Sequence, residues 1–425
     1  MGKRFLCLFL FCSSLVCGQQ ISSKRIARQI KKIPAFQKAH VAISISALGD
    51  QKTAASYQGA HYMTPASNVK LLTFLAAKQQ FNKLPAVYYY KENDRLIHFK
   101  ASGYPLLLHP FYPETTLASF FSQEASYIYH PPSITPNPLG EGWAWDDYPY
   151  YYAAERSAFP IYGNALQATL KDNALQLTPS FFEQKGVIDS LGPKFKRLQS
   201  INAFSYNLSE WQKNDTLTRP FITSDSLFVK LLSESTGNKV VLADQSWEEF
   251  PWEQLYSNDD APLYRGLLQD SDNGIAEALL LMIGEDLFNE MDSKKVIDSI
   301  LVSWKPWLKD PIQWVDGSGV SRYNMVTPRT LVGVLQKTYE TVGWETIQDY
   351  FPKGSNSGTL KKYDNASVFA KTGTLRHNHN LSGYLVHPKG TTYVFSIMVN
   401  HHTAEAEEVR AGIGSLLKWF EDKLN

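Results

Sequence analysis

The chain has 425 residues, 44% of them hydrophobic, and a formal net charge of +1. A chain of this length can bury a sizeable core, and two or three domains are more typical of it than one. The near-neutral charge, without a basic stripe or an acidic tract, argues against nucleic-acid binding and against disorder.

The first residues are expected to form an export signal. Lys3 and Arg4 precede an apolar segment, Phe5–Val16, that is too short to cross a bilayer comfortably. The alternative is a non-exported protein with an apolar N-terminal helix, but the basic start and the short segment argue against it. We therefore predict a signal peptide over residues 1–18, cleaved after Gly18, and a periplasmic protein.

All three cysteines (Cys7, Cys12 and Cys17) lie inside this segment. The mature chain would therefore have no disulfide, no cysteine metal ligand and no thiol nucleophile. A lipid anchor on Cys17 is the alternative, but the preceding Val16 is not the small residue that such processing requires. We do not expect a lipoprotein.

The next segments alternate between helix and strand patterns. Ile26, Ile30 and Ile33 recur at helical spacing, and residues 40–48 alternate as a strand does. Pro65 suits an early helical position, and the apolar run of residues 69–77 predicts a helix buried almost all round. From residue 83 to 247 the pattern changes to aromatic clusters, short β-like runs and scattered prolines, which predicts an inserted β-rich region of one or two subdomains.

Helical patterns return after the insertion, and strand patterns follow them. The expected helices cover 261–288, 293–308, 327–346 and 404–424, and the expected strands cover 367–373, 381–388 and 391–400. This order predicts an α+β fold in which an antiparallel sheet is flanked by helices. The domain would be split by the insertion into residues 19–82 and 248–425.

Ser67 and Lys70 are the first candidate catalytic pair. Their spacing places both side chains on one face of a helix that begins there, close to backbone N–H groups that could hold an oxyanion. A partly desolvated lysine can act as a base toward serine, although an ordinary helix entry has the same pattern. Ser415 and Lys418 repeat the spacing in the last helix, where Lys418 is expected to face solvent.

Ser-x-Asn occurs three times, starting at Ser200, Ser205 and Ser271. The first two lie in the expected insertion, and their polar residues are expected to belong to ordinary loops. Ser271-Asp272-Asn273 precedes an apolar helical run, so it could carry chemistry or simply supply an N-cap.

Lys371-Thr372-Gly373 occurs once, on an expected strand. Lys371 and Gly373 would face the same side there, and the glycine would let a helix or a ligand approach closely. The P-loop, HExxH, GxSxG and GxGxxG motifs are absent from the sequence.

The order Ser-x-x-Lys, Ser-x-Asn, Lys-Thr-Gly resembles that of penicillin-binding proteins and serine β-lactamases. Four segments are similar to the D-alanyl-D-alanine carboxypeptidase/endopeptidase family of low-molecular-mass penicillin-binding proteins, peptidase family S13: PASNVKLLT, SDNGIAEAL, DGSGVSRYNMVTPR and AKTGTL with LSGYL. That family has a large insertion between its first two motifs, and 203 residues separate Ser67 from Ser271 here. The resemblance implies a transpeptidase-like domain and hydrolysis of peptidoglycan stem peptides, with β-lactams as inhibitors and no cofactor or metal.

The resemblance also implies roles for single residues. Ser67 would attack the carbonyl of the penultimate D-alanine, and Lys70 would take its proton. Ser271 would relay a proton to the leaving amine with help from Lys371. Asn273 would bind a substrate amide and orient Lys70.

The remaining implied roles concern substrate binding. Backbone N–H groups of Ser67 and Thr374 would form the oxyanion hole. Lys371 and the hydroxyls of Thr372 and Thr374 would hold the terminal carboxylate, beside Gly373. Asp147 matches the family position that meets the cationic end of the stem-peptide diamino acid.

Other residues allow further interpretations. Four histidines (His377, His379, His401 and His402) flank the last strands and could form a metal site, but no carboxylate or cysteine completes the set, and polar loop positions are the alternative. Ser318 lies between glycines that more simply indicate a tight turn near the cleft. Trp143 and Trp145 could line a peptide groove or pack in the interior.

Two alternative functions remain at the level of the sequence. A class A β-lactamase would have an E-x-x-L-N segment after the second motif, which is absent, and no large insertion. A non-catalytic cell-wall binder on the same fold would not need the intact Ser67, Lys70, Ser271, Asn273 and Lys371.

Overall fold

The computed structural model describes residues 20–50, 52–132, 136–244 and 250–424. The predicted signal peptide and its three cysteines lie outside these residues. Within the described ranges, no helix is both long enough and apolar enough to span a membrane.

The order of elements along the chain is given by their bounds. The helices are α1 (Ser23–Ile30), α2 (Lys70–Gln80), α3 (Thr116–Phe121), α4 (Asp225–Thr236), α5 (Ala261–Arg265), α6 (Asn273–Phe288), α7 (Ser293–Trp304), α8 (Pro328–Tyr350) and α9 (Ala406–Lys423). The strands are β1 (His40–Ala47), β2 (Thr53–Tyr57), β3 (Pro85–Asn93), β4 (Leu96–Ala101), β5 (Ser126–His130), β6 (Ala165–Lys171), β7 (Ala174–Thr178), β8 (Gly186–Ile188), β9 (Phe195–Arg197), β10 (Phe204–Tyr206), β11 (Thr216–Pro220), β12 (Val240–Leu242), β13 (Glu253–Tyr256), β14 (Val368–Leu375), β15 (Asn378–Val386) and β16 (Thr392–Asn400).

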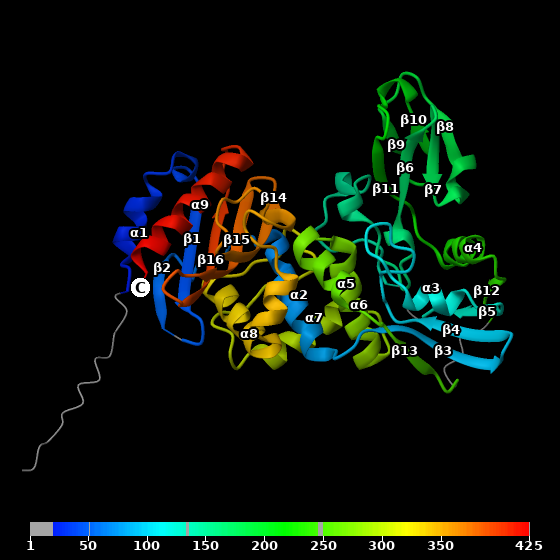
Figure 1. The fold of residues 1–425 in the computed structure, drawn as a ribbon, viewed down its shortest axis with the longest axis horizontal. Coiled ribbons are helices and arrows are strands. Elements are labelled where there is room, and N and C mark those ends of the chain that lie inside the picture. Colours follow the sequence, from blue (N-terminus) through cyan, green and yellow to red (C-terminus); the bar gives the residue numbers. More distant parts are fainter. Residues whose placement is uncertain (1–19, 51, 133–135, 245–249, 425) are drawn as a thin grey trace, which may run out of the picture.

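A five-stranded sheet of order β14-β15-β16-β1-β2 joins the two ends of the chain. Its neighbouring strands are all antiparallel. Helices α1 and α9 cover one face, and α2 and α8 lie on the other side (Figure 1). Val41, Ile43 and Ile45 pack under α9, whereas Ala42 faces the opposite core, as the two-residue period of a strand requires. The predicted α+β fold is confirmed, and strand β2 was not predicted.

Residues between β3 and β13 form the part of the molecule farthest from α9 (Figure 1). They make one five-stranded sheet, β12-β5-β4-β3-β13, and two three-stranded sheets, β11-β6-β7 and β8-β10-β9. Helices α3 and α4 also lie here, and neither was predicted. The signals for α4 are present in the sequence: Ser224 caps its first turn by accepting from Leu227 N, and Gly237 ends it at φ +72°.

One expected helix agrees with the structure and another is interrupted. The first turns of α2, residues 70–77, are buried on every side, as its apolar sequence predicts. The expected helix over 261–288 is interrupted, because α5 is followed by a π-helical turn at residues 266–270 and Ser271 has left-handed backbone at φ +63°. Such turns are often found at functional sites, and this one separates α5 from α6 at the Ser-x-Asn motif.

Candidate functional site

Ser67 lies in a 3₁₀ turn, Ala66–Val69, that leads directly into α2. Ala66 has a left-handed φ of +50°, which is unfavourable for a residue with a Cβ atom. The side chain of Asn68 holds this turn against the sheet, since its Nδ2 donates to Lys371 O at 2.7 Å and its Oδ1 accepts from Ser382 Oγ at 3.0 Å. The turn carrying Ser67 is therefore tied to both β14 and β15.

Gly373 makes the close packing between β14 and this turn possible. A Cβ atom added at Gly373 would lie 2.3 Å from Pro65 O and 3.2 Å from Ser67 N. No side chain fits there without moving the backbone of the turn. The predicted close approach at this glycine is confirmed, and the approaching element is the turn that carries Ser67.

We expect Gly373→Ala to reduce the rate at which a penicillin acylates Ser67, the predicted nucleophile, by at least about tenfold, because a misplacement of about 1 Å can cost about a hundredfold in rate. The new methyl group would push against the backbone of Pro65 and Ser67. Stopped-flow acylation kinetics measure the effect, and Gly333→Ala on α8, where an added Cβ meets nothing within 4 Å, is the matched control. An unchanged rate in Gly373→Ala would contradict the prediction.

Lys70 is fully buried directly behind Ser67. Its Nζ lies 3.2 Å from Ser67 Oγ, 2.6 Å from Asn273 Oδ1 and 2.6 Å from Ser318 O. Burial lowers the pKa of Lys70 from 10.5 to about 8, and the charges of Asp316, then Asp272 and Glu277, oppose this effect. Near neutral pH a useful fraction of this amine is therefore unprotonated.

The three contacts of Lys70 fix the direction of its lone pair. When Lys70 is charged, its three N–H groups donate to Ser67 Oγ, Asn273 Oδ1 and Ser318 O. When it is neutral, two hydrogens still donate to Asn273 Oδ1 and Ser318 O, and the remaining lone pair faces Ser67 Oγ–H. Ser67 Oγ and Lys70 Nζ thus have the relative positions expected of a serine hydroxyl and its base, and both residues lie within one helical turn.

Asn273 begins α6, and Asp272 is the N-cap, accepting from Ile275 N at 3.0 Å. The amide of Asn273 is held from both ends: Oδ1 accepts from Lys70, and Nδ2 donates to Tyr152 O at 2.6 Å. The predicted N-cap is confirmed for Asp272. The same motif also brings the side chain of Asn273 into hydrogen-bond contact with Lys70.

Ser271 opens into a pocket instead of contacting the lysines. Within the described residues, no hydrogen bond joins its side chain to Lys70 or Lys371. The pocket has a volume of about 440 Å³ and is lined by Phe111, Tyr112, Tyr151, Tyr152 and residues 270–273. Ser271 is therefore accessible to a ligand beside Asn273.

Lys371 is also fully buried, and its Nζ donates to Thr372 O at 2.9 Å. Burial, followed by the nearby charge of Lys70, lowers the pKa of Lys371 well below 10.5. Three residues after Lys371 on the strand, Thr374 is exposed at the surface of the site, whereas Thr372 is buried. Strand β14 thus presents a buried amine, within the Lys-Thr-Gly motif, and an exposed hydroxyl just after it.

The DGSG segment forms the floor under Lys70. The predicted tight turn is confirmed: Gly319 has φ +85°, and a Cβ atom there would lie 2.0 Å from Ala66 O. Ser318 contributes its backbone carbonyl to Lys70, and its hydroxyl faces the buried Asp316 at 3.4 Å. Ser318 is thus a structural residue of the turn.

Asp316 organises this turn from the inside. It is completely buried and accepts hydrogen bonds from Gly319 N (2.9 Å), Ser321 N (2.6 Å), Asn324 Nδ2 (2.7 Å) and Trp143 Nε1 (2.9 Å). Trp143 therefore bonds to the turn that carries Asp316, and the exposed fraction of Trp145 is 74%.

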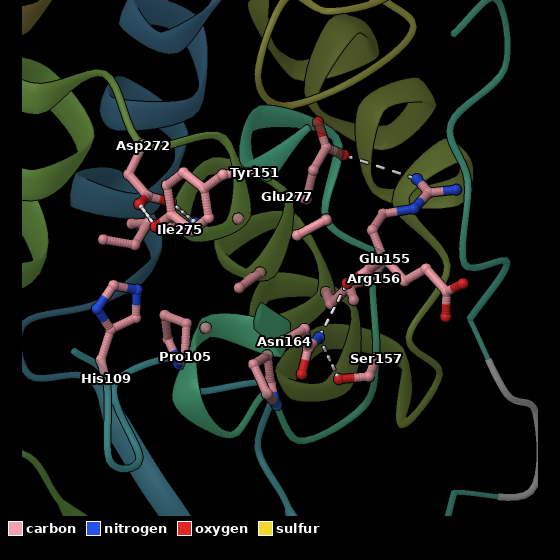
Figure 2. Close-up of a pocket in the computed structure, with 16 residues that line it drawn as sticks. Pro105, His109, Tyr151, Glu155, Arg156, Ser157, Asn164, Asp272, Ile275 and Glu277 are labelled. Carbon is pink, nitrogen blue, oxygen red and sulfur yellow. Dashed lines mark hydrogen bonds and ion pairs between the residues drawn. The ribbon is translucent and has the colours of Figure 1, made fainter. Parts of the chain in front are cut away.

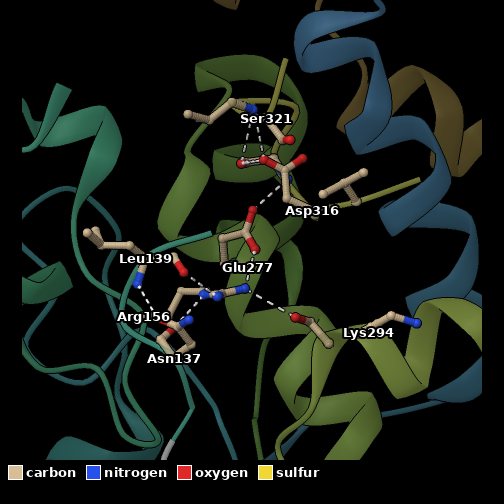
Figure 3. A network of polar contacts seen from close by, with 12 residues as sticks. Asn137, Leu139, Arg156, Glu277, Lys294, Asp316 and Ser321 are labelled. Carbon is tan, nitrogen blue, oxygen red and sulfur yellow. Dashed lines mark hydrogen bonds and ion pairs between the residues drawn. The ribbon is translucent and has the colours of Figure 1, made fainter. Parts of the chain in front are cut away.

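A second buried carboxylate, Glu277 on α6, links the turn to Arg156 and the segment around it (Figure 3). Its Oε1 accepts from Ser318 N at 2.8 Å, and its Oε2 lies 3.6 Å from Arg156 Nη1. Arg156 also donates to Asn137 O at 2.9 Å and Leu139 O at 2.8 Å. Burial, followed by the charge of Asp316, raises the pKa of Glu277, and Arg156 opposes this effect.

A small pocket of about 20 Å³ lies beside the start of α6 (Figure 2). Asp272, the N-cap of α6, and Glu277 line one side of it, and Tyr151 and Arg156 line another. The Tyr151 hydroxyl donates to Asp272 Oδ2, so the N-cap of α6 is also bonded to this segment of the chain. Trp143, Tyr151 and Arg156 therefore contact the three carboxylates that act on Lys70.

Asp147 lies in the 3₁₀ turn Trp145–Asp147, and its Oδ1 accepts from the hydroxyl of Tyr152 at 2.8 Å. Tyr152 in turn stacks on Tyr150 and supplies the carbonyl that holds Asn273. Asp146 is exposed and has no such bond among the described contacts. Asp147 is thus connected to the site through a single residue.

The other candidate patterns are structural. Ser415 and Lys418 are both exposed on α9, as predicted for Lys418. Asn202 and Asn207 bond backbone groups of their own region. In the described part of the chain, no group of three or more histidine, cysteine, aspartate or glutamate residues is arranged to hold a metal.

The histidines that suggested a metal site make separate contacts. His377 Nδ1 bonds His402 O, and His402 Nδ1 bonds Ala404 O, each at 3.0 Å. His401 packs edge-on against His40. His379 is buried and bonds Thr374 and Tyr363.

Sequence reasoning missed several residues that hold the site. The carbonyls of Ser318 and Tyr152 carry no side-chain signal, because every residue has one. Asp316 and Glu277 could have been found, because both lie within the sequence segments that resemble the family, close to the motif residues.

Comparison with known proteins identifies the family of this chain. The model of the D-Ala-D-Ala carboxypeptidase 3 (S13) family matches residues 22–84 and 213–419. The D-alanyl-D-alanine carboxypeptidase DacB of Haemophilus influenzae is 22% identical over 425 residues, which is 87% of each chain. A penicillin-sensitive carboxypeptidase A of Dictyostelium discoideum is 35% identical over 108 residues, 22% of this chain and 20% of that protein.

The fold is also found among solved structures. Penicillin binding protein 4 (dacB) from Haemophilus influenzae superimposes with a TM-score of 0.72 at 19% identity, covering 94% of this chain and 98% of that one. A structure of the same protein complexed with a β-lactam has a TM-score of 0.67 at 16% identity, covering 94% and 99%. On the family match, this chain belongs to the D-Ala-D-Ala carboxypeptidase 3 (S13) family of peptidases.

Proposed function

We propose that this protein is a serine D-Ala-D-Ala carboxypeptidase and DD-endopeptidase that cleaves peptidoglycan stem peptides through an acyl-enzyme on Ser67. The arrangement of Lys70 carries the proposal. Its two amine hydrogens are taken by Asn273 Oδ1 and Ser318 O, which leaves the lone pair for the Ser67 hydroxyl. A cell-wall binder would gain nothing from burying a lysine in this way, because burial disfavours its charge.

Acylation follows from these contacts. Ser67 Oγ attacks the carbonyl carbon of the penultimate D-alanine while its proton passes to Lys70 Nζ. Backbone N–H groups of Ser67 and Thr374 hold the oxyanion that forms. As the C–N bond breaks, Ser271 Oγ gives its proton to the leaving amine and is reprotonated by Lys70. Among the described residues of the free protein, no hydrogen bond joins these two side chains, so this contact must form when substrate binds. Water then attacks the ester carbonyl while Lys70 takes one of its protons, the C–Oγ bond breaks, and Lys70 returns the proton to Ser67 Oγ.

The C-terminal end of the substrate binds at the Lys-Thr-Gly motif. Lys371 and the hydroxyls of Thr372 and Thr374 bind the terminal carboxylate beside Gly373, whose missing side chain keeps the strand close to Ser67. A carboxylate bound here favours the charged form of Lys371 and opposes the pKa depression that burial causes. Asn273 also binds a substrate amide, and Asp147 meets the cationic end of the stem-peptide diamino acid.

The remaining proposals concern organisation and location. Residues 19–82 and 248–425 form a transpeptidase-like domain, and 83–247 is an inserted region that supplies Tyr151, Tyr152 and Arg156 to its edge. Residues 1–18 act as a signal peptide, and the mature protein is periplasmic, consistent with a substrate outside the cytoplasm.

A fluorescent penicillin tests the proposed function. We expect a stable adduct that mass spectrometry of peptides maps to Ser67. In separate assays without penicillin, we expect release of D-alanine from pentapeptide and cleavage of cross-linked muropeptides. Rapid turnover of the adduct without peptide hydrolysis would indicate a β-lactamase. Absence of any adduct, with retained binding to cell walls, would indicate a non-catalytic binder and refute the proposal.

A further inference from the structure

Thr374 is the first of three side chains that form a line of hydrogen bonds from the surface of the site into the core. Its Oγ1 lies 2.8 Å from Nδ1 of His379, the residue directly opposite it on β15. The Nε2 atom of the same ring lies 2.7 Å from the hydroxyl of Tyr363. His379 and Tyr363 are each 3% exposed, whereas Thr374 is exposed.

The imidazole of His379 is neutral under ordinary conditions and therefore carries a single N–H. Burial, followed by the positive charges of Arg410 and His402, lowers its pKa from 6.5 to about 4. One ring nitrogen donates and the other accepts, so the two neighbours of His379 cannot both be donors or both be acceptors.

Tyr363 determines which nitrogen carries the hydrogen. Its buried hydroxyl must donate, because a buried O–H without an acceptor costs about 1–3 kcal/mol. In the described part of the chain, Nε2 of His379 is the only hydrogen-bond partner of this hydroxyl. Tyr363 therefore donates to Nε2, the ring hydrogen is on Nδ1, and Nδ1–H donates to Thr374 Oγ1.

The consequence appears at the exposed end of the line. Since Thr374 Oγ1 accepts from His379, its own hydrogen is free to point toward the site. With the opposite tautomer, Thr374 would donate into the protein and present only lone pairs, which repel a carboxylate. We propose that His379 and Tyr363 are positioning residues that make the Thr374 hydroxyl a hydrogen-bond donor to the terminal carboxylate of the substrate. This inference rests on the proposed function, in which Thr374 binds that carboxylate.

Tyr363→Phe removes the hydroxyl and keeps the ring, so the hydrogen of His379 can move to Nε2. We expect KM for a D-Ala-D-Ala stem peptide to rise about fivefold with kcat changed less than about twofold, since one charge-assisted hydrogen bond to bound substrate is weakened. Tyr384→Phe is the matched control: Tyr384 is also buried on β15, and its hydroxyl donates to Leu335 O at 2.7 Å, without contact to Thr374. Its KM should equal that of the wild type.

A double-mutant cycle shows whether the effect passes through Thr374. Thr374→Val should itself raise KM, and Tyr363→Phe should add nothing in that background. A full additive effect, or an unchanged KM in Tyr363→Phe alone, would overturn the inference. Penicillin labelling of Ser67 in each variant separates this result from failure of the proposed function, because a wild type that is never acylated refutes the function itself.

Nitrogen-15 NMR of the histidine side chains tests the same inference without any substrate. The His379 signal, assigned by its loss in His379→Gln, should report a hydrogen on Nδ1 in the wild type. A hydrogen on Nε2 would overturn the inference. Tyr363→Phe should move the ring toward the Nε2–H tautomer, which a merely structural role of Tyr363 would not predict.

Discussion

Replacing Lys70 by methionine is expected to lower the rate constant for acylation of Ser67 by about a thousandfold, within the range that a positioned general base contributes. Methionine has a similar length and suits a buried position, but it has no lone pair to accept the Ser67 proton. Nζ of Lys70 is the only basic nitrogen within hydrogen-bond distance of Ser67 Oγ among the described residues. Stopped-flow kinetics with a penicillin measure the acylation rate.

Lys418→Met is the matched control for this substitution. Lys418 occupies the same position in a second Ser-x-x-Lys sequence, but it is exposed on α9. Its loss should leave acylation unchanged, while Ser67→Ala should abolish it and define the background. A Lys70→Met variant that folds and is acylated within about threefold of the wild-type rate would exclude Lys70 as the base.

The pH dependence of acylation follows from the same residue. Only the neutral amine accepts a proton, and the pKa of Lys70 is about 8 because burial lowers it from 10.5. The rate constant should therefore rise about tenfold per pH unit well below pH 8 and level off above it. A lysine with an ordinary pKa would still show a rising rate above pH 9, and that outcome would contradict the structural account.

Much of the scaffold could be predicted because its signals are local. The spacing of Ser67 and Lys70 places them in one turn, and the alternation of residues 40–48 and 391–400 predicts strands that the structure pairs as β1 and β16. Helix α4 was missed although Ser224 and Gly237 mark its ends, because the aromatic and β-like composition around it outweighed those caps.

The contacts that tune the site could not be predicted in this way. Tyr152 and Ser318 contribute backbone carbonyls, which any residue type supplies, and they come from segments far apart in the chain. The histidines near the last strands were grouped by their closeness in sequence. The strand places His379 opposite Thr374, whereas His377 lies in the turn before it, so the ring nitrogens make unrelated bonds.

Asp316→Asn is expected to destabilise the folded protein by about 2–4 kcal/mol, because a buried charged acceptor with several partners is lost. Asp316 accepts from two backbone N–H groups and from Asn324 and Trp143. An amide offers one oxygen where the carboxylate offers two, and its NH₂ group would face donors. Urea unfolding should show a lower midpoint at an unchanged m-value.

Asp349→Asn is the control for loss of a carboxylate charge by itself. Asp349 pairs with Arg265 at the surface, where both side chains are almost half exposed, so the substitution should cost less than about 1 kcal/mol. Equal destabilisation by the two substitutions would contradict the role given to the buried network.

Asp316→Asn should also change catalysis, because the charge of Asp316 influences the pKa of Lys70. Asp316 is the carboxylate that most strongly opposes the lowering of the Lys70 pKa. Removing its charge should lower that pKa further below about 8, so the rising limb of the acylation profile should move to lower pH. The maximal rate should also fall, because the turn that presents Ser318 O to Lys70 loses its anchor. A limb that moves to higher pH would refute this electrostatic assignment, whatever happens to stability.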